Sequence, residues 1–66
     1  MQVTVNGAAH SFEAPLDVGA LLERLAMAGR KVAVERNGEI VPRGRHREVL
    51  LENGDRLEVV AAVGGG

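Results

Sequence analysis

Side chains that could carry out chemistry are few in this sequence. There is no cysteine, which excludes disulfides, thiolate-based metal sites and any side-chain thiol. His10 and His46 are the two histidines, and no third ligand candidate stands near either one at a recognisable spacing. The sequence therefore predicts no metal site.

The carboxylates are more numerous, but their pattern does not indicate catalysis. Glu35, Glu39 and Glu58 fall on turns or on the outer faces of expected strands. Nothing indicates a buried pair with the shifted pKa values that general acid–base catalysis uses. A chain of 66 residues also has little material with which to enclose an active site. We assign these residues no catalytic role.

The remaining reactive group is the C-terminal carboxylate of Gly66. The chain ends in Gly64-Gly65-Gly66, and a run of glycines neither continues a strand nor adds packing. We therefore expect one domain over residues 1–62 and a flexible, freely projecting tail over residues 63–66.

Composition excludes several classes of partner. Phe12 is the only aromatic residue, so the chain lacks stacking platforms for single-stranded nucleic acid, and a net charge of −1 gives no general attraction to phosphate. The N-terminus lacks the pattern of a secretion signal, and the longest apolar run, residues 59–63, is too short to span a bilayer. We expect a cytoplasmic monomer that binds neither nucleic acid nor membranes and holds no cofactor.

A hairpin and a helix are expected in the first half of the chain. Apolar and polar residues alternate up to Asn6-Gly7, which favours a two-residue turn within a β-hairpin over residues 1–13. Asp17 can cap a helix over residues 18–28, and Gly29 can end it. The apolar positions with helical spacing are Val18, Leu21, Leu22 and Leu25.

Strands are expected in the second half. Extended segments are predicted at residues 32–34, 40–41 and 49–51, and a last strand over residues 57–61 follows the turn Asn53-Gly54-Asp55. The order is β-β-α-β-β-β. A single helix then buries its leucines across one face of a mixed sheet. We predict an α+β fold of the β-grasp type with four or five strands.

Five stretches carry a resemblance to a known family. They are residues 3–7, 18–25, 34–43, 53–55 and 63–66. Along them the chain resembles, from end to end, the ubiquitin-like sulfur carriers of thiamine biosynthesis, the ThiS type. A terminal Gly-Gly alone is shared with other ubiquitin-like proteins and with the small subunit of molybdopterin synthase, so the middle stretch adds the specificity. His46 departs from the pattern, because family members often have an aromatic residue in that loop.

The resemblance implies a reaction cycle. A ThiF-like adenylating enzyme would use ATP, with magnesium, to adenylate the carboxylate of Gly66. Sulfur from a donor protein would then displace AMP and leave a thiocarboxylate, which a ThiG-like thiazole synthase would consume. Because glycine has no Cβ, Gly64 and Gly65 would fit a narrow nucleotide pocket. The chain would be a protein substrate rather than an enzyme.

Partner contacts are expected along the last strand and the tail. If Leu57 and Val59 point inward, Val60 points outward, and we expect Thr4 and Ala33 to lie near it on adjacent strands. We interpret this apolar patch as a docking surface. The residues expected to contact partners are Val60, Val63, Gly64 and Gly65.

Three other functions are compatible with the sequence. A carrier for another pathway, such as molybdopterin or amino-acid synthesis, would use the same tail. A β-grasp module that binds partners without covalent chemistry would not need a free C-terminus. A ubiquitin-like modifier is disfavoured, because Lys31 is the only lysine on which a chain could grow.

Three side-chain environments stay open. A strict turn at Asn6-Gly7 would put His10 on the same face as Val3, whereas a bulge would turn it outward. Met27 falls on the helix face opposite Leu21 and is expected to be exposed. The loop with Arg43, Arg45, His46 and Arg47 is either a solvated turn or an electrostatic docking site for an acidic partner.

Overall fold

A computed structural model describes residues 1–61. Its elements are β1 (Gln2–Val5), β2 (Ala8–Ser11), α1 (Val18–Arg24), β3 (Val32–Arg36), β4 (Glu39–Val41), the 3₁₀ helix η1 (Arg43–Arg45) and β5 (Arg56–Ala61). The predicted order β-β-α-β-β-β is therefore confirmed, although residues 49–51, also predicted to be extended, form no strand. The predicted flexible tail over residues 63–66 lies outside the described residues.

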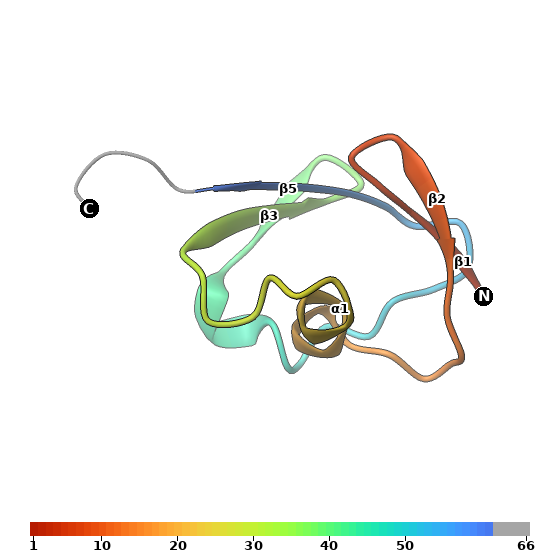
Figure 1. Ribbon diagram of the computed structural model, residues 1–66, viewed down its shortest axis with the longest axis horizontal. Coiled ribbons are helices and arrows are strands. Elements are labelled where there is room, and N and C mark those ends of the chain that lie inside the picture. Colours follow the sequence, from red (N-terminus) through yellow and green to blue (C-terminus); the bar gives the residue numbers. More distant parts are fainter. Residues whose placement is uncertain (62–66) are drawn as a thin grey trace.

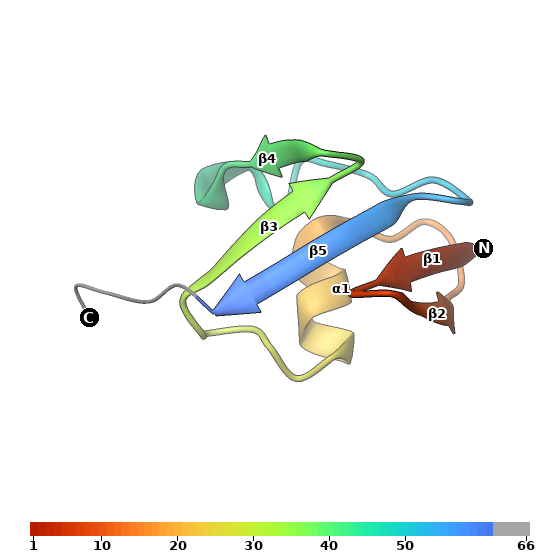
Figure 2. The same ribbon diagram turned by 90° about the horizontal axis from the view of Figure 1, so that it is seen from above.

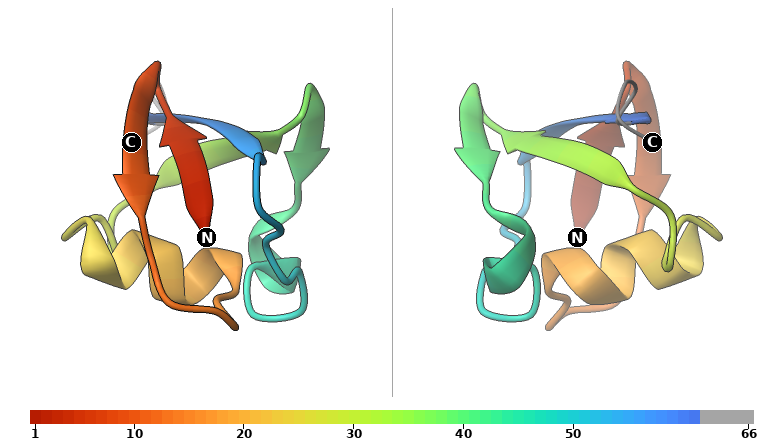
Figure 3. Two further views of the ribbon diagram at one scale, coloured as in Figure 1. Left: turned by 90° about the vertical axis from the view of Figure 1, so that its right-hand side faces the viewer. Right: turned by 90° about the vertical axis from the view of Figure 1, so that its left-hand side faces the viewer.

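The five strands form one mixed sheet in the order β2-β1-β5-β3-β4. β5 runs parallel to β1 and antiparallel to β3, and each outer strand forms a hairpin with its neighbour (Figure 2). Helix α1 crosses one face of this sheet, and no element within residues 1–61 covers the other face (Figures 1 and 3). This arrangement is the predicted β-grasp.

Both hairpins turn at an Asn-Gly pair. Asn6 and Gly7 have φ angles of 50° and 84°, and Asn37 and Gly38 have 51° and 87°. Positive φ at both central residues matches the right-handed twist of the flanking strands. The two-residue turn predicted at residues 6–7 is confirmed.

This turn decides the position of His10. Val5 pairs with Ala8 and Val3 pairs with His10, without a bulge. His10 therefore lies on the same face of the sheet as Val3 and is half-buried, and its ring stacks on Phe12 with centroids 5.9 Å apart. Because β2 is an edge strand, the polar imidazole can remain partly solvated.

Helix α1 is shorter than predicted. Asp17 caps it as expected, since its Oδ1 accepts a hydrogen bond of 2.7 Å from the Ala20 N–H. However, the helix ends at Arg24, and Ala26 rather than Gly29 takes the left-handed conformation of the C-terminal cap, with φ of 59°. The prediction that the helix extends to residue 28 is wrong, because the C-terminal cap forms at Leu25 and Ala26.

The hydrogen bonds of the cap explain the early stop. The Met27 N–H donates to the Leu22 carbonyl at 2.7 Å, and the Ala26 N–H donates to the Glu23 carbonyl at 3.1 Å. This pair of bonds is the Schellman motif, which satisfies the last carbonyls of a helix. A left-handed alanine carries a steric cost that glycine would not, so the sequence pattern pointed to the wrong residue.

The predicted strand at residues 49–51 is also wrong. Only Leu50 forms a bridge, with Asp17, outside the sheet. The neighbouring main chain instead bonds to the segment before the helix, through Val18 N–H to Val49 O and Leu51 N–H to Leu16 O. This segment therefore holds the start of α1 rather than extending the sheet.

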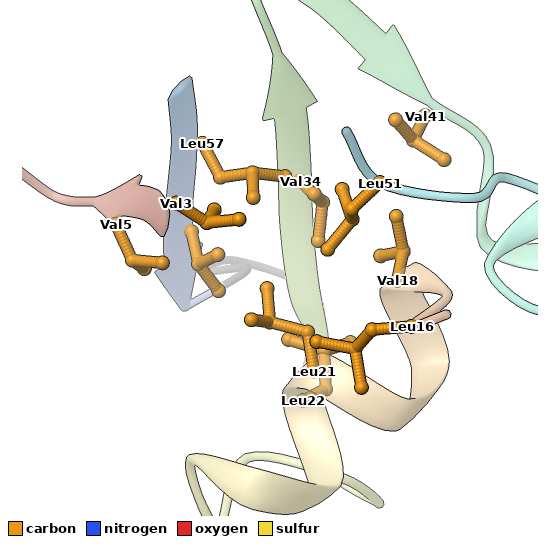
Figure 4. Packing of buried hydrophobic residues seen from close by; sticks show 11 residues of the cluster. Val3, Val5, Leu16, Val18, Leu21, Leu22, Val34, Val41, Leu51 and Leu57 are labelled. Carbon is orange, nitrogen blue, oxygen red and sulfur yellow. The ribbon is translucent and has the colours of Figure 1, made fainter. Parts of the chain in front are cut away.

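The core lies between α1 and the inner face of the sheet (Figure 4). Three of the four helix positions predicted to pack there are buried, and Leu25 at the C-cap packs against them while half-buried. The buried apolar residues are Val3, Val5, Leu16, Val18, Leu21, Leu22, Val34, Val41, Leu51, Leu57 and Val59. Within residues 1–61, no helix has both the length and the apolar character needed to cross a bilayer.

Candidate functional site

The last strand, β5, is held on both sides in the middle of the sheet. It is hydrogen-bonded to β1 on one side and to β3 on the other, and its final residue, Ala61, pairs with Val32. The chain therefore reaches its last described residue in a fixed position and direction. The tail residues predicted to carry out the chemistry or contact partners, Val63, Gly64, Gly65 and Gly66, lie outside the described residues.

The side chain of Asn6 extends the pairing of β5 beyond the end of β1. Its Oδ1 accepts a hydrogen bond from the Val59 N–H at 2.8 Å, and its Nδ2 donates to the Val59 carbonyl at 2.9 Å. The amide thus takes the place of a further residue of β1. Sequence reasoning identified Asn6 as a turn residue and missed this contact, because the partner lies 53 residues away.

The outer face of the sheet is apolar next to the end of β5. Val60 is 57% exposed on this face, whereas its neighbour Val59 is buried, as predicted. Ala33 is the cross-strand partner of Val60, which confirms that part of the predicted patch. Thr4 does not belong to it, because β1 pairs Thr4 with Arg56, near the other end of β5.

Acidic side chains occupy the middle of this outer face. Glu35 and Glu58 are directly opposite each other on β3 and β5, and Glu35 also pairs with Ile40 on β4. Like charges in directly opposed positions weaken the pairing of two strands. Glu35, Glu39 and Glu58 are all exposed. These carboxylates therefore face solvent and form no enclosed acid–base site.

A buried carboxylate anchors the start of β5. Asp55 accepts hydrogen bonds from Arg36 Nε at 2.8 Å, from Asn37 Nδ2 at 3.1 Å and from the Glu52 N–H at 2.8 Å. Burial raises the pKa of Asp55, but these bonds and the Arg36 charge together outweigh burial and hold the pKa below its ordinary value. The network ties the β3–β4 turn to the first residues of β5.

The basic loop, residues 43–47, is partly neutralised by ion pairs within the domain. Arg47 lies across Gly19 and reaches Glu23 at 2.9 Å and Asp17 at 3.7 Å. A Cβ at Gly19 would approach the Arg47 side chain to 2.7 Å, so glycine permits this contact. The hydrogen bond from Arg47 lowers the pKa of Glu23. Arg47 therefore fastens the loop to α1.

The described part of the chain shows no cluster of metal ligands. Among residues 1–61, no group of three or more His, Asp or Glu side chains is arranged to hold a metal ion. His10 and His46 belong to different regions, one on β2 and one after η1. The geometry instead offers a rigid strand leading to the C-terminus, with an apolar face beside it.

Comparisons with known proteins agree with this geometry. Residues 3–66 match the sequence model of the ThiS family. A thiazole synthase from Paramagnetospirillum magneticum is 48% identical over 66 residues, and one from Magnetococcus marinus is 44% identical. These matches cover the whole of this chain but only 20% of each thiazole synthase.

A solved structure extends the likeness to the fold. The crystal structure of a thiamine biosynthesis protein (ThiS) from Geobacter metallireducens aligns with a TM-score of 0.85 at 35% sequence identity. The alignment covers all of both chains. At this identity and coverage the two chains share the whole architecture, from β1 to the last strand.

Proposed function

The chain belongs to the ThiS family, and on that premise we propose that it is a sulfur carrier for thiazole formation in thiamine biosynthesis. The working group is the carboxylate of Gly66. The observation that carries the proposal is the placement of β5. β5 is paired with β1 through Leu57, is held by the Asn6 side chain at Val59 and is paired with β3 as far as Ala61, so the residues that follow start from a fixed point.

The proposed chemistry has two steps. A carboxylate oxygen of Gly66 attacks the α-phosphorus of ATP, pyrophosphate leaves, and an acyl-adenylate forms. A sulfide equivalent from a donor protein then attacks the carbonyl carbon and expels AMP, which leaves a thiocarboxylate. Adenylation is needed because a free carboxylate repels nucleophiles and has a poor leaving group.

Catalysis of these steps belongs to the partners. The activating enzyme supplies the cations and the magnesium that hold the triphosphate. This chain supplies the nucleophilic carboxylate and a glycine segment without Cβ atoms, which fits a narrow pocket. The chain is thus a protein substrate rather than an enzyme.

The apolar patch at Val60 and Ala33 is the proposed docking surface for these partners. It lies on the uncovered sheet face at the end of β5, so a partner that binds it also lies near the C-terminus. Exposed apolar groups on a partner-facing surface gain free energy when they leave water.

Thiazole synthase is the acceptor that the relatives favour. Two thiazole synthases contain a region 48% and 44% identical to this chain as about a fifth of their length. A domain of this kind within a thiazole synthase supports a working contact between the two. A pull-down with identification of the bound proteins tests the pathway, and recovery of a molybdopterin synthase large subunit would overturn it.

Exchange of radiolabelled pyrophosphate into ATP tests the proposed activation. The activating enzyme should catalyse exchange only when this chain is present, because the acyl-adenylate forms on Gly66 and reverses with pyrophosphate. A chain lacking Gly66 or extended by a C-terminal tag should support no exchange. Equal exchange with the tagged chain would mean that another group is adenylated and would contradict the proposal.

A further inference from the structure

A groove of about 220 Å³ lies between the turn that follows α1 and the segment at η1. Its apolar wall includes Leu22 and Met27, and its polar lining includes Arg30, Arg43 and His46. Among residues 1–61, no aspartate or glutamate lines it. The groove therefore places positive charge beside apolar surface.

The groove exists because the helix ends early. Met27, expected to be exposed, is half-buried and packs against the core. The Schellman bonds turn the chain back after Arg24 and direct Met27 toward Leu22. The following residues, up to Arg30, then stand opposite η1 rather than continuing along the helix axis.

Internal ion pairs divide the basic residues of this region into two sets. Arg45 pairs with Glu48 at 3.6 Å, and Arg47 pairs with Glu23 at 2.9 Å. Within residues 1–61, Arg30 and Arg43 form no such ion pair and are exposed. Two guanidinium groups at the groove are thus available to a charged partner.

The groove lies at the end of the domain where β5 finishes. Val32 lines the groove, and it is also the cross-strand partner of Ala61. Figure 1 shows η1, the start of β3 and the end of β5 toward the same end of the molecule. A protein that encloses the C-terminal glycines would therefore approach the groove.

We propose that this groove binds carboxylate side chains of the activating enzyme, through Arg30 and Arg43. The inference rests on the proposed function, because it takes as partner the enzyme that adenylates Gly66. Adenylation requires the terminal segment to enter a nucleotide pocket, so this enzyme must approach the end of β5 closely. Guanidinium groups bind carboxylates through paired hydrogen bonds.

Binding through these arginines should depend on salt in a defined way. Charges at the edge of an interface act mainly on the association rate, and salt screens them. Loss of a groove arginine should therefore weaken binding most at low ionic strength. It should leave the turnover of the bound complex unchanged, since the groove residues do not contact the reacting carboxylate.

The test compares Arg43→Glu with Arg24→Glu, which changes net charge equally at an exposed position outside the groove. The wild-type chain is first assayed for pyrophosphate exchange, which tests the proposed function separately. The KM for each variant is then measured at low and at high salt. Arg30→Glu serves as a second groove variant, and circular dichroism establishes that each protein is folded.

We expect Arg43→Glu and Arg30→Glu to raise KM about tenfold at low salt, which corresponds to the loss of one charge-assisted contact. High salt should reduce the difference, and kcat should not change. If Arg24→Glu raises KM as much, the effect is one of net charge and the groove is not a binding site. If the wild-type chain supports no exchange, the proposed function fails and this inference fails with it.

Discussion

The side-chain amide of Asn6 pairs with both main-chain groups of Val59. A single residue thus shapes the β1–β2 turn with a φ of 50° and also holds β5 two residues before Ala61. Because the glycines that we propose to be functional follow this strand, the pair links hairpin geometry to the position of the C-terminus.

Replacing Asn6 with glycine should separate these two roles. Asn6→Gly keeps the positive φ but removes both hydrogen bonds, so we expect the free energy of unfolding to fall by about 1–3 kcal/mol. Amide hydrogen exchange should show a loss of protection at Val59. Unchanged protection there would mean that β1 and β3 hold this part of β5 without Asn6.

Ala26 offers a way to stabilise the domain. Glycine suits its left-handed conformation, so Ala26→Gly should raise the free energy of unfolding by about 0.5–1 kcal/mol. Ala28→Gly is the matched control, because Ala28 has no positive φ and gains only backbone freedom in the unfolded state. Thermal melts measure both, and equal effects would exclude relief of backbone strain.

Asp55 should make the free energy of unfolding depend on pH in the acidic range. Its folded-state pKa is lowered, so its contribution is fully present above the unfolded pKa of about 3.9 and is lost as pH falls through the folded value. Asp55→Asn should cost about 1.5–3 kcal/mol at neutral pH, because three bonds to a carboxylate are weakened.

Urea unfolding at several pH values measures this dependence. The difference between the wild type and Asp55→Asn should shrink below about pH 4, where protonation of Asp55 removes the same interactions. A constant difference across the pH range would show that the charge of Asp55 does not contribute.

Features specified by neighbouring residues were predictable from the sequence. The Asn6-Gly7 turn, the Asp17 cap and the inward alternation of Leu57 and Val59 all follow from local rules and are confirmed. The end of α1 was not predictable in this way, because an alanine, Ala26, stands at the left-handed position of the cap, where glycine is usual.

Long-range contacts were the other limit. The parallel register of β1 and β5, which pairs Thr4 with Arg56, depends on strands more than 50 residues apart. The Asn6 contact and the Arg47 ion pairs likewise need the folded chain. The sequence predicted the outward position of Val60 but not the basic groove, which depends on how two loops approach each other.

Val60→Asp tests the docking patch. A charge on the apolar patch must lose water when a partner binds, so affinity for the activating enzyme or thiazole synthase should fall about tenfold or more. Leu50→Asp is the control, because Leu50 is 59% exposed, close to the 57% of Val60, and lies outside the sheet. Isothermal titration calorimetry showing equal affinities for the two variants would contradict the patch.

Intact-protein mass spectrometry tests the central claim most directly. The chain is incubated with ATP, the activating enzyme and a sulfur source, and fragmentation then locates any added mass. We predict the mass gain of one oxygen-to-sulfur exchange at Gly66, and none in a chain with a C-terminal tag. Sulfur found on another residue, or retained in the tagged chain, would contradict the assignment of this protein as a sulfur carrier.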